Sequence, residues 1–140
     1  ILTTLPPLFL GSPYPVFVPR TDSDGNDVSG IRLPVVAVPL ATYTGWSLRA
    51  AAFAGDDVCD ASGQKLDFRQ TKAERLAVAD TRLSIEERYR NHGAYVSAVA
   101  HAANNLHQQR LLLGEDVERI LGKERAPGVA VVMDAEPSQG

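Results

Sequence analysis

The sequence predicts an α+β fold, with an irregular edge β-ribbon in the first third of the chain and a helical C-terminal half. Two runs of strand-forming residues, 14–18 and 31–44, flank the segment TDSDGNDVSG, which consists almost entirely of turn-forming residues. This arrangement predicts a β-hairpin. A stripe of apolar and semi-apolar residues within 85–113 recurs every three or four positions and predicts one long amphipathic helix.

Prolines place the predicted ribbon at the edge of a sheet. In the first run, Pro15 and Pro19 flank a short strand over 16–18, and Pro34 and Pro39 interrupt the second run. Because proline has no N–H to donate to a neighbouring strand, we expect regular pairing in the second run only over 35–38 and after Pro39.

Two capping signatures open the helical half. Thr71 with Glu74, and Ser84 with Glu87, both match the capping box, in which the side chains at the two positions bond reciprocally to the backbone. The first box predicts a short helix ending at about Val78, and the second predicts the start of the long helix.

The long helix is predicted from one face of apolar spacing. Its members are Ile85, Tyr89, His92, Val96, Val99, Ala103 and Leu106. Gly114 is predicted to end this helix in a left-handed conformation, and residues 115–121 to form one further short helix.

One domain is expected from 140 residues. Its predicted parts are an extended apolar arm (1–13), the β-ribbon with the DSDGND turn (14–49), a loop anchored by Leu66 and Phe68 (50–70), a helical region (71–122) and a loose tail (123–140) in which 129–133 is a candidate strand. The chain begins with Ile1 rather than Met, from which we expect a piece of a longer protein.

Composition excludes several classes of protein. A net charge of -3 with dispersed basic residues argues against nucleic-acid binding. The apolar opening is too short and too rich in proline to span a membrane, and it lacks the charged region and the small-residue cleavage site of a signal peptide. Cys59 is the single cysteine, so an internal disulfide and a cysteine-based metal site are excluded, and a packing role is expected for it.

Four oxygen-bearing side chains in the DSDGND segment are a candidate calcium site: Asp22, Asp24, Asn26 and Asp27. The spacing does not match an EF-hand, because Gly25 is the fourth residue of the loop instead of the sixth and Leu33 stands at the twelfth, where glutamate is needed. Asp-Gly is also a strong turn dipeptide. A hairpin turn is the favoured interpretation, and weak calcium binding stays open.

No catalytic residue and no cofactor site are predicted. Gly45-Trp46-Ser47-Leu48-Arg49 has only the first half of the Gly-x-Ser-x-Gly nucleophile motif. The three histidines (His92, His101 and His107) lie nine and six residues apart and make no metal-binding pair, and His92 is expected to be a hydrogen-bonded packing residue. The charged cluster Glu86, Glu87, Arg88 and Arg90 predicts a solvated face or an arginine–carboxylate contact that, if buried, would brace a loop.

Tyr43, Trp46 and Arg49 are the candidates for lining a ligand pocket or cleft, because large aromatic residues here accompany a glycine-containing turn and an arginine. Packing, including packing against a neighbouring unit, is the favoured interpretation of Trp46.

Three segments resemble the C-terminal part of a family of bacterial α/β-hydrolase-domain proteins, which are large and mostly exported. The segments are PVFVPRTDSDGNDVSGIRLPVVAVPLATYTGWSLR, FRQTKAERLAVADTRLSIEERY and RLLLGEDVERI, and the resemblance covers roughly residues 14–121. It implies that this chain is an incomplete part of an α/β-hydrolase fold, with the nucleophile and the catalytic histidine upstream of Ile1. It also implies an exported or periplasmic protein.

The functional hypothesis is an accessory C-terminal region of an esterase-type hydrolase, not catalytic alone. Its partner would be the upstream hydrolase core of the same protein, with Tyr43, Trp46 and Arg49 facing the cleft. One alternative is an independent interaction or oligomerisation module, whose long helix and exposed ribbon edge pair with a protein partner or with a copy of the same chain. The other is a weak calcium-binding domain.

Overall fold

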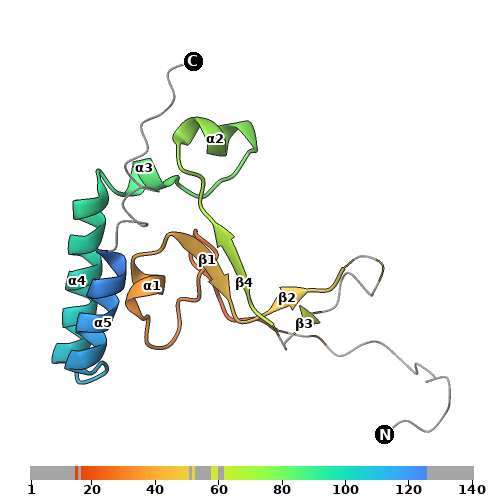
Figure 1. Ribbon diagram of the computed structural model, residues 1–140. Helices are drawn as coiled ribbons and strands as arrows, with labels where there is room; N and C mark the ends of the chain where they lie inside the picture. Colours follow the sequence, from red (N-terminus) through yellow and green to blue (C-terminus); the bar gives the residue numbers. More distant parts are fainter. Residues whose placement is uncertain (1–14, 16, 51, 53–57, 60–61, 126–140) are drawn as a thin grey trace, which may run out of the picture.

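The computed structural model describes residues 15, 17–50, 52, 58–59 and 62–125, and it confirms the α+β class (Figure 1). Small antiparallel strand pairs lie beside a pair of helices. The elements in chain order are α1 (Pro34–Ala37), β1 (Ala41–Thr44), β2 (Ser47–Leu48), β3 (Val58–Cys59), β4 (Gln64–Asp67), α2 (Lys72–Ala77), α3 (Ile85–Arg88), α4 (His92–Gln108) and α5 (Gly114–Glu124).

Two strand pairs make up the described β-structure. β1 pairs with β4 in a register that runs from Ala41 opposite Asp67 to Thr44 opposite Gln64, and β2 pairs with β3. The expectation of a loop over 50–70 was therefore wrong, because β3 and β4 lie within it. Gly63 permits the close approach of β4 to β1: a Cβ atom there would lie 2.3 Å from the carbonyl oxygen of Thr44.

The predicted second strand is partly helical. Residues 35–38 were expected to pair in a sheet, but Pro34 opens the one-turn helix α1, where its fixed φ and missing N–H are both compatible with the first helical position. The strand after Pro39 is confirmed as β1. Phe17 and Val18 are not in a strand, and Tyr14 and Val16 lie outside the described residues, as do the predicted arm and the candidate strand at 129–133.

The predicted long helix is divided into α3 and α4. Both capping boxes are present, but Tyr89 has extended backbone angles and its hydroxyl donates to the carbonyl oxygen of Pro39 at 3.0 Å. Asn91 then caps α4 by accepting a hydrogen bond from the Ala94 N–H. A contact to a residue fifty positions away thus accompanies the break.

The end of α4 also differs from the prediction. Arg110 has a φ of 62° and is the left-handed residue after α4, whereas Gly114 is the first residue of α5. The further short helix expected at 115–121 is confirmed, and it is longer than expected.

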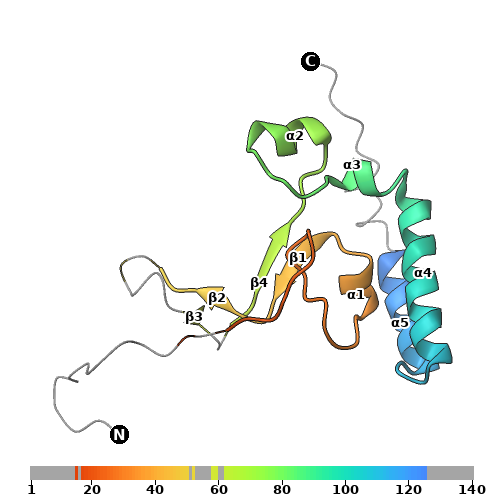
Figure 2. The same ribbon diagram turned by 180° about the vertical axis from the view of Figure 1, so that it is seen from behind.

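The buried core lies along the seam of α4 and α5. Tyr95, Val99 and Ala103 project from one face of α4 at intervals of four residues and pack against Val117 and Leu121 of α5. The apolar spacing correctly predicted Val99 and Ala103 on this face, but it predicted Val96 there in place of Tyr95. Both views show α5 beside α4, with α1 between this pair and β1 (Figure 2). No described helix is long and apolar enough to cross a bilayer.

Candidate functional site

The DSDGND segment forms a tight turn organised by the carboxylate of Asp22. Oδ1 of Asp22 accepts hydrogen bonds from the N–H groups of Asp24 (2.9 Å) and Asn26 (3.0 Å), and Oδ2 pairs with Arg32 at 2.7 Å. Partial burial opposes ionisation, but these donors outweigh it and lower the pKa of Asp22. The hairpin turn is confirmed, with a bridge between Thr21 and Asp27.

Asn26 closes the outer edge of β1 with its side-chain amide. Its Nδ2 donates to the carbonyl oxygen of Ala41 at 3.2 Å, and its Oδ1 accepts from the N–H of Tyr43 at 2.7 Å. The side chain is completely buried. One amide therefore supplies the donor and acceptor that a neighbouring strand would supply, and it fixes the turn on the sheet.

Asp24 connects this turn to α3 through Arg88. The guanidinium of Arg88 binds the Asp24 carboxylate through both terminal nitrogens, one of them at 2.8 Å, and its Nε donates to the carbonyl oxygen of Leu83. The two charged side chains are only 12% and 16% exposed. This contact is the buried version of the predicted arginine–carboxylate contact, and it braces the loop as expected.

The ring of Phe68 is close to the guanidinium groups of two arginines at the same place. The guanidinium carbon of Arg88 is 4.1 Å from the ring centroid and that of Arg82 is 5.2 Å away, so both are within the range of cation–π attraction. Arg82 also donates to the hydroxyl of Thr42 at 2.8 Å. We call these five residues the arginine brace: Asp24, Thr42, Phe68, Arg82 and Arg88.

Two further ion pairs fix the arginines and the connecting segments around the brace. Asp80 binds Arg82 through both carboxylate oxygens, and this contact lowers the pKa of Asp80 to about 2. Arg75 of α2 binds both oxygens of Glu87 at 2.6 and 2.9 Å. Together with the N–H of Ser84, Arg75 lowers the pKa of Glu87. These carboxylates stay ionised well into the acid range.

The predicted calcium ligands are brought together, but arginines and backbone groups already bind three of the four, and Oδ1 of the fourth, Asp27, is buried without a hydrogen-bond partner among the described residues. Arg32 binds Asp22, Arg88 binds Asp24, and the amide of Asn26 faces β1. No cluster of three potential metal-binding His, Cys, Asp or Glu side chains occurs within the described part of the chain. A cation bound by Asp22 or Asp24 would have to displace an arginine, and weak calcium binding stays a prediction for calorimetry.

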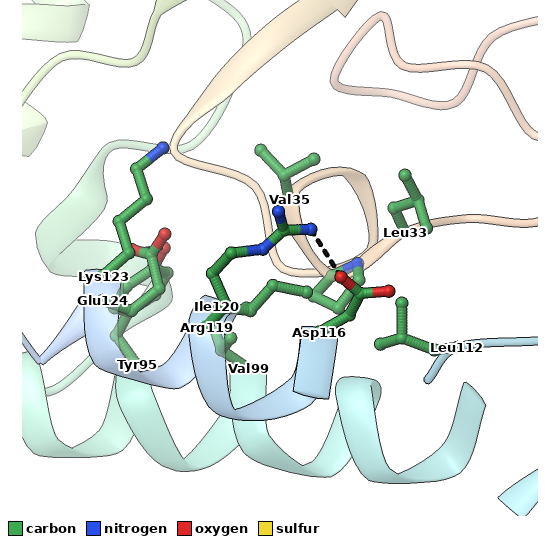
Figure 3. A pocket seen from close by; sticks show the side chains of 11 residues that line it. Leu33, Val35, Tyr95, Val99, Leu112, Asp116, Arg119, Ile120, Lys123 and Glu124 are labelled. Atoms are coloured by element: carbon green, nitrogen blue, oxygen red, sulfur yellow. Dashed lines mark hydrogen bonds and ion pairs between the residues drawn. The ribbon is translucent and has the colours of Figure 1, made fainter. Parts of the chain in front are cut away.

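A hollow of about 340 Å³ opens between α1, α4 and α5 (Figure 3). Its floor is apolar and includes Val99 and Ile120, and its rim carries Asp116, Arg119, Lys123 and Glu124. Asp116 and Arg119 form an ion pair across part of the rim. The volume is at the lower end of the range for small-molecule sites, and the lining contains no serine, histidine or cysteine.

Tyrosine hydroxyls near this hollow have structural partners. Tyr95 donates to Oε2 of Glu124 at 2.8 Å, and burial followed by that carboxylate raises the pKa of Tyr95. Burial raises the pKa of Tyr89 to about 12. His92 contacts the carbonyl oxygen of Glu124 through Nε2 at 2.8 Å, which agrees with the expected packing role. These contacts fix the end of α5 against the start of α4.

The three candidate cleft residues are not assembled into one site. Tyr43 of β1 is half-buried, Trp46 is partly buried in the turn that connects β1 to β2, and Arg49 is exposed. No hydrogen bond or ring contact joins them within the described residues, and none of them lines the hollow. Their orientation toward a cleft stays a prediction.

The most important residues of the brace were not predicted as a group. Phe68 was expected to be an anchor and is 3% exposed, but Leu66, named with it, is 48% exposed. The roles of Asn26, Thr42 and Arg82 have no signal in the sequence, because each depends on a partner at least fifteen positions away.

Comparison with known proteins identifies a family to which this chain is similar. A family model described as alpha/beta hydrolase domain matches residues 4–122. No curated protein and no solved structure matches the chain significantly.

Proposed function

Because the chain belongs to the alpha/beta hydrolase domain family, we propose that it is the supporting region of an esterase-type hydrolase, which packs on the catalytic core and is not catalytic alone. In this proposal, the chemistry resides in residues outside this chain. The arginine brace and the helix pair provide a rigid support for apolar surfaces that the core covers.

The observation that carries the proposal is the amount of apolar side chain left in solvent. Thirteen large hydrophobic residues of the described part are exposed, at 42–87% of their surface, against eight buried hydrophobic residues in the core. Soluble monomers expose single hydrophobic residues routinely, but so high a ratio is typical of a surface that another part of a protein covers.

Helix α2 gives the sharpest case. It buries none of its residues, and Leu76 is 59% exposed, with Val78 just after the helix 54% exposed. Its main attachments are polar: the Thr71 cap, the Arg75–Glu87 ion pair and the contact of Glu86 with the Lys72 N–H. Figure 1 shows α2 apart from the helix pair. Since short helices depend on tertiary packing, α2 fits a helix whose apolar side faces a missing neighbour.

Two measurements test this proposal. The isolated 140-residue chain should hydrolyse p-nitrophenyl acetate no faster than buffer does. In the longer protein, the double substitution Leu76→Lys/Val78→Lys should lower the melting temperature by several degrees, whereas in the isolated chain it should leave the melting temperature unchanged. Ala77→Lys is the matched control, because it adds a charge to the same helix without removing a large apolar side chain.

The opposite results would refute the proposal. An enzymatic rate in the isolated chain that disappears when one of its own serines or histidines is replaced would place the chemistry here. Equal effects of the double substitution in both proteins would show that α2 packs only within this chain. Export of the longer protein is also part of the proposal, on the family resemblance, and cell fractionation tests it.

A further inference from the structure

Among the described residues, the outer edge of β4 is an open strand edge. Within them β4 pairs with β1 alone, and all four of its side chains are exposed. In Figures 1 and 2, no labelled strand or helix lies alongside β4 on the side away from β1. The other side of the same sheet differs, because the amide of Asn26 occupies the edge of β1.

The register determines which backbone groups face outward. The N–H of Phe68 donates to the carbonyl oxygen of Leu40 at 3.1 Å. Because inward and outward groups alternate along a strand, Leu66 directs its N–H and C=O toward β1, and Lys65 and Asp67 direct theirs away from it. Within the described part of the chain, the backbone groups of these two residues have no partner.

The two residues whose backbone groups face outward carry side chains of opposite charge. Lys65 and Asp67 lie on the same face of β4, two positions apart, and their side chains form an exposed ion pair at 2.7 Å. If a second β4 pairs antiparallel about Leu66, Lys65 of each strand stands opposite Asp67 of the other. Both residues of each such pair have outward backbone groups, so this register forms four backbone hydrogen bonds and two cross-strand charge pairs.

Leu66 occupies the centre of this arrangement. It stands opposite its own copy as a non-hydrogen-bonded pair, where side chains approach most closely, and 48% of its surface is available for that contact. A shift by one residue would place inward-facing backbone groups in the new interface. A shift by two would place Lys65 opposite Lys65, or Asp67 opposite Asp67, so that like charges would meet. One register therefore satisfies backbone, charge and apolar contacts together.

We propose that β4 is a self-pairing edge, through which two copies of this chain associate about a two-fold axis at Leu66. This proposal is independent of the docking of α2 on a hydrolase core. The interface is small, so weak association is expected, at concentrations approaching about 1 mM.

Charge exchange provides the test. Lys65→Glu and Asp67→Lys should each weaken self-association at least tenfold, because every cross-strand pair then joins like charges. The double variant Lys65→Glu/Asp67→Lys should recover it. An equimolar mixture of the two single variants should also associate, because each acid then meets a lysine. Sedimentation equilibrium measures the dissociation constant of each variant and of the mixture.

Amide chemical shifts of the unaltered chain provide a second readout. The N–H signals of Lys65 and Asp67 should move with protein concentration, while that of Leu66 should change little because it faces β1. The side chains at both positions are exposed, at 58% and 68%, so the variants should fold as the unaltered chain does, and circular dichroism checks this.

A chain that stays monomeric up to about 1 mM would overturn the proposal. So would variants that associate as the unaltered chain does, or a mixture that fails to recover association. Association that depends on Leu76 and Val78 instead would assign it to the α2 surface.

Discussion

The helix pair and the ribbon region are stabilised by different interactions. α4 and α5 meet through side chains such as Val99 and Leu121, which bury apolar surface along one seam. In contrast, the DSDGND turn, β1 and α3 meet through the arginine brace and the buried amide of Asn26. Apolar packing tolerates small shifts, whereas each polar contact requires one partner in one geometry.

This difference predicts two kinds of sensitivity. Loss of volume should matter most in the helix pair, and loss of a single partner or of ionisation should matter most in the ribbon region. Substitutions in each region and unfolding at acidic pH distinguish these two kinds of sensitivity.

The largest effect is expected from Leu121→Ala. Leu121 is 6% exposed, and removing its side chain leaves a cavity in the seam, so the free energy of unfolding should fall by about 3 kcal/mol. Urea denaturation measures this. Leu113→Ala is the control, because that side chain is 62% exposed and its loss should change stability by less than about 0.5 kcal/mol. Similar losses in both variants would contradict the assignment of the core.

Arg88→Met should cost about 2 kcal/mol, because it keeps much of the side-chain volume but leaves the mostly buried carboxylate of Asp24 without its arginine. Combining it with Asp24→Asn should cost less than the sum of the single substitutions. Urea denaturation of all four proteins completes the cycle. Strict additivity would show that the pair does not brace the turn.

Gly25→Ala should destabilise the chain by about 1–2 kcal/mol through its positive φ and a contact with Thr42. Gly25 has a φ of 79°, and a Cβ atom there would lie 2.9 Å from Cγ2 of Thr42. Gly30 has nearly the same φ, 80°, but a Cβ atom added there would meet no other atom within 4 Å, so Gly30→Ala isolates the backbone contribution. Equal losses of stability in the two variants would mean that a side chain at position 25 makes no unfavourable contact with Thr42 of β1.

The smallest effect is expected from acid. The pKa of Glu87 is lowered by Arg75 and Ser84, and that of Asp80 is about 2. A lowered pKa stabilises the folded state above the unfolded pKa, so this stability is complete at neutral pH and is lost as pH falls from about 4.5 toward 2.

Glu87→Gln tests the acid effect directly. The variant should be less stable than the unaltered chain at pH 7 and should lose less stability on acidification, since it cannot be protonated at this site. Denaturation at several pH values measures the difference between the two curves, and parallel curves would contradict the prediction.

The elements that were predicted correctly from the sequence are those determined by residues only a few positions apart. Thr71 and Ser84 are followed three residues later by glutamate, and the capping box needs nothing else. The turn at Gly25 likewise depends on residues within five positions. In the candidate site, the prediction of an arginine–carboxylate brace depended on the charge cluster that contains Arg88.

Elements with distant causes were not predictable in the same way. The break at Tyr89 accompanies a bond to Pro39, and β4 exists because β1 lies beside it. Pro34 is compatible both with an edge strand and with the first turn of a helix, so the local sequence does not decide between them. The partners of Asn26 and Arg82 become visible only once the chain is folded.

The amide of Asn26 has a consequence for any assembly that uses this sheet. Since it occupies one flank of β1, a new strand can be added only along β4. Two copies joined there form a four-stranded sheet that ends in an asparagine on both flanks, so growth stops at two and a fibre cannot extend from it.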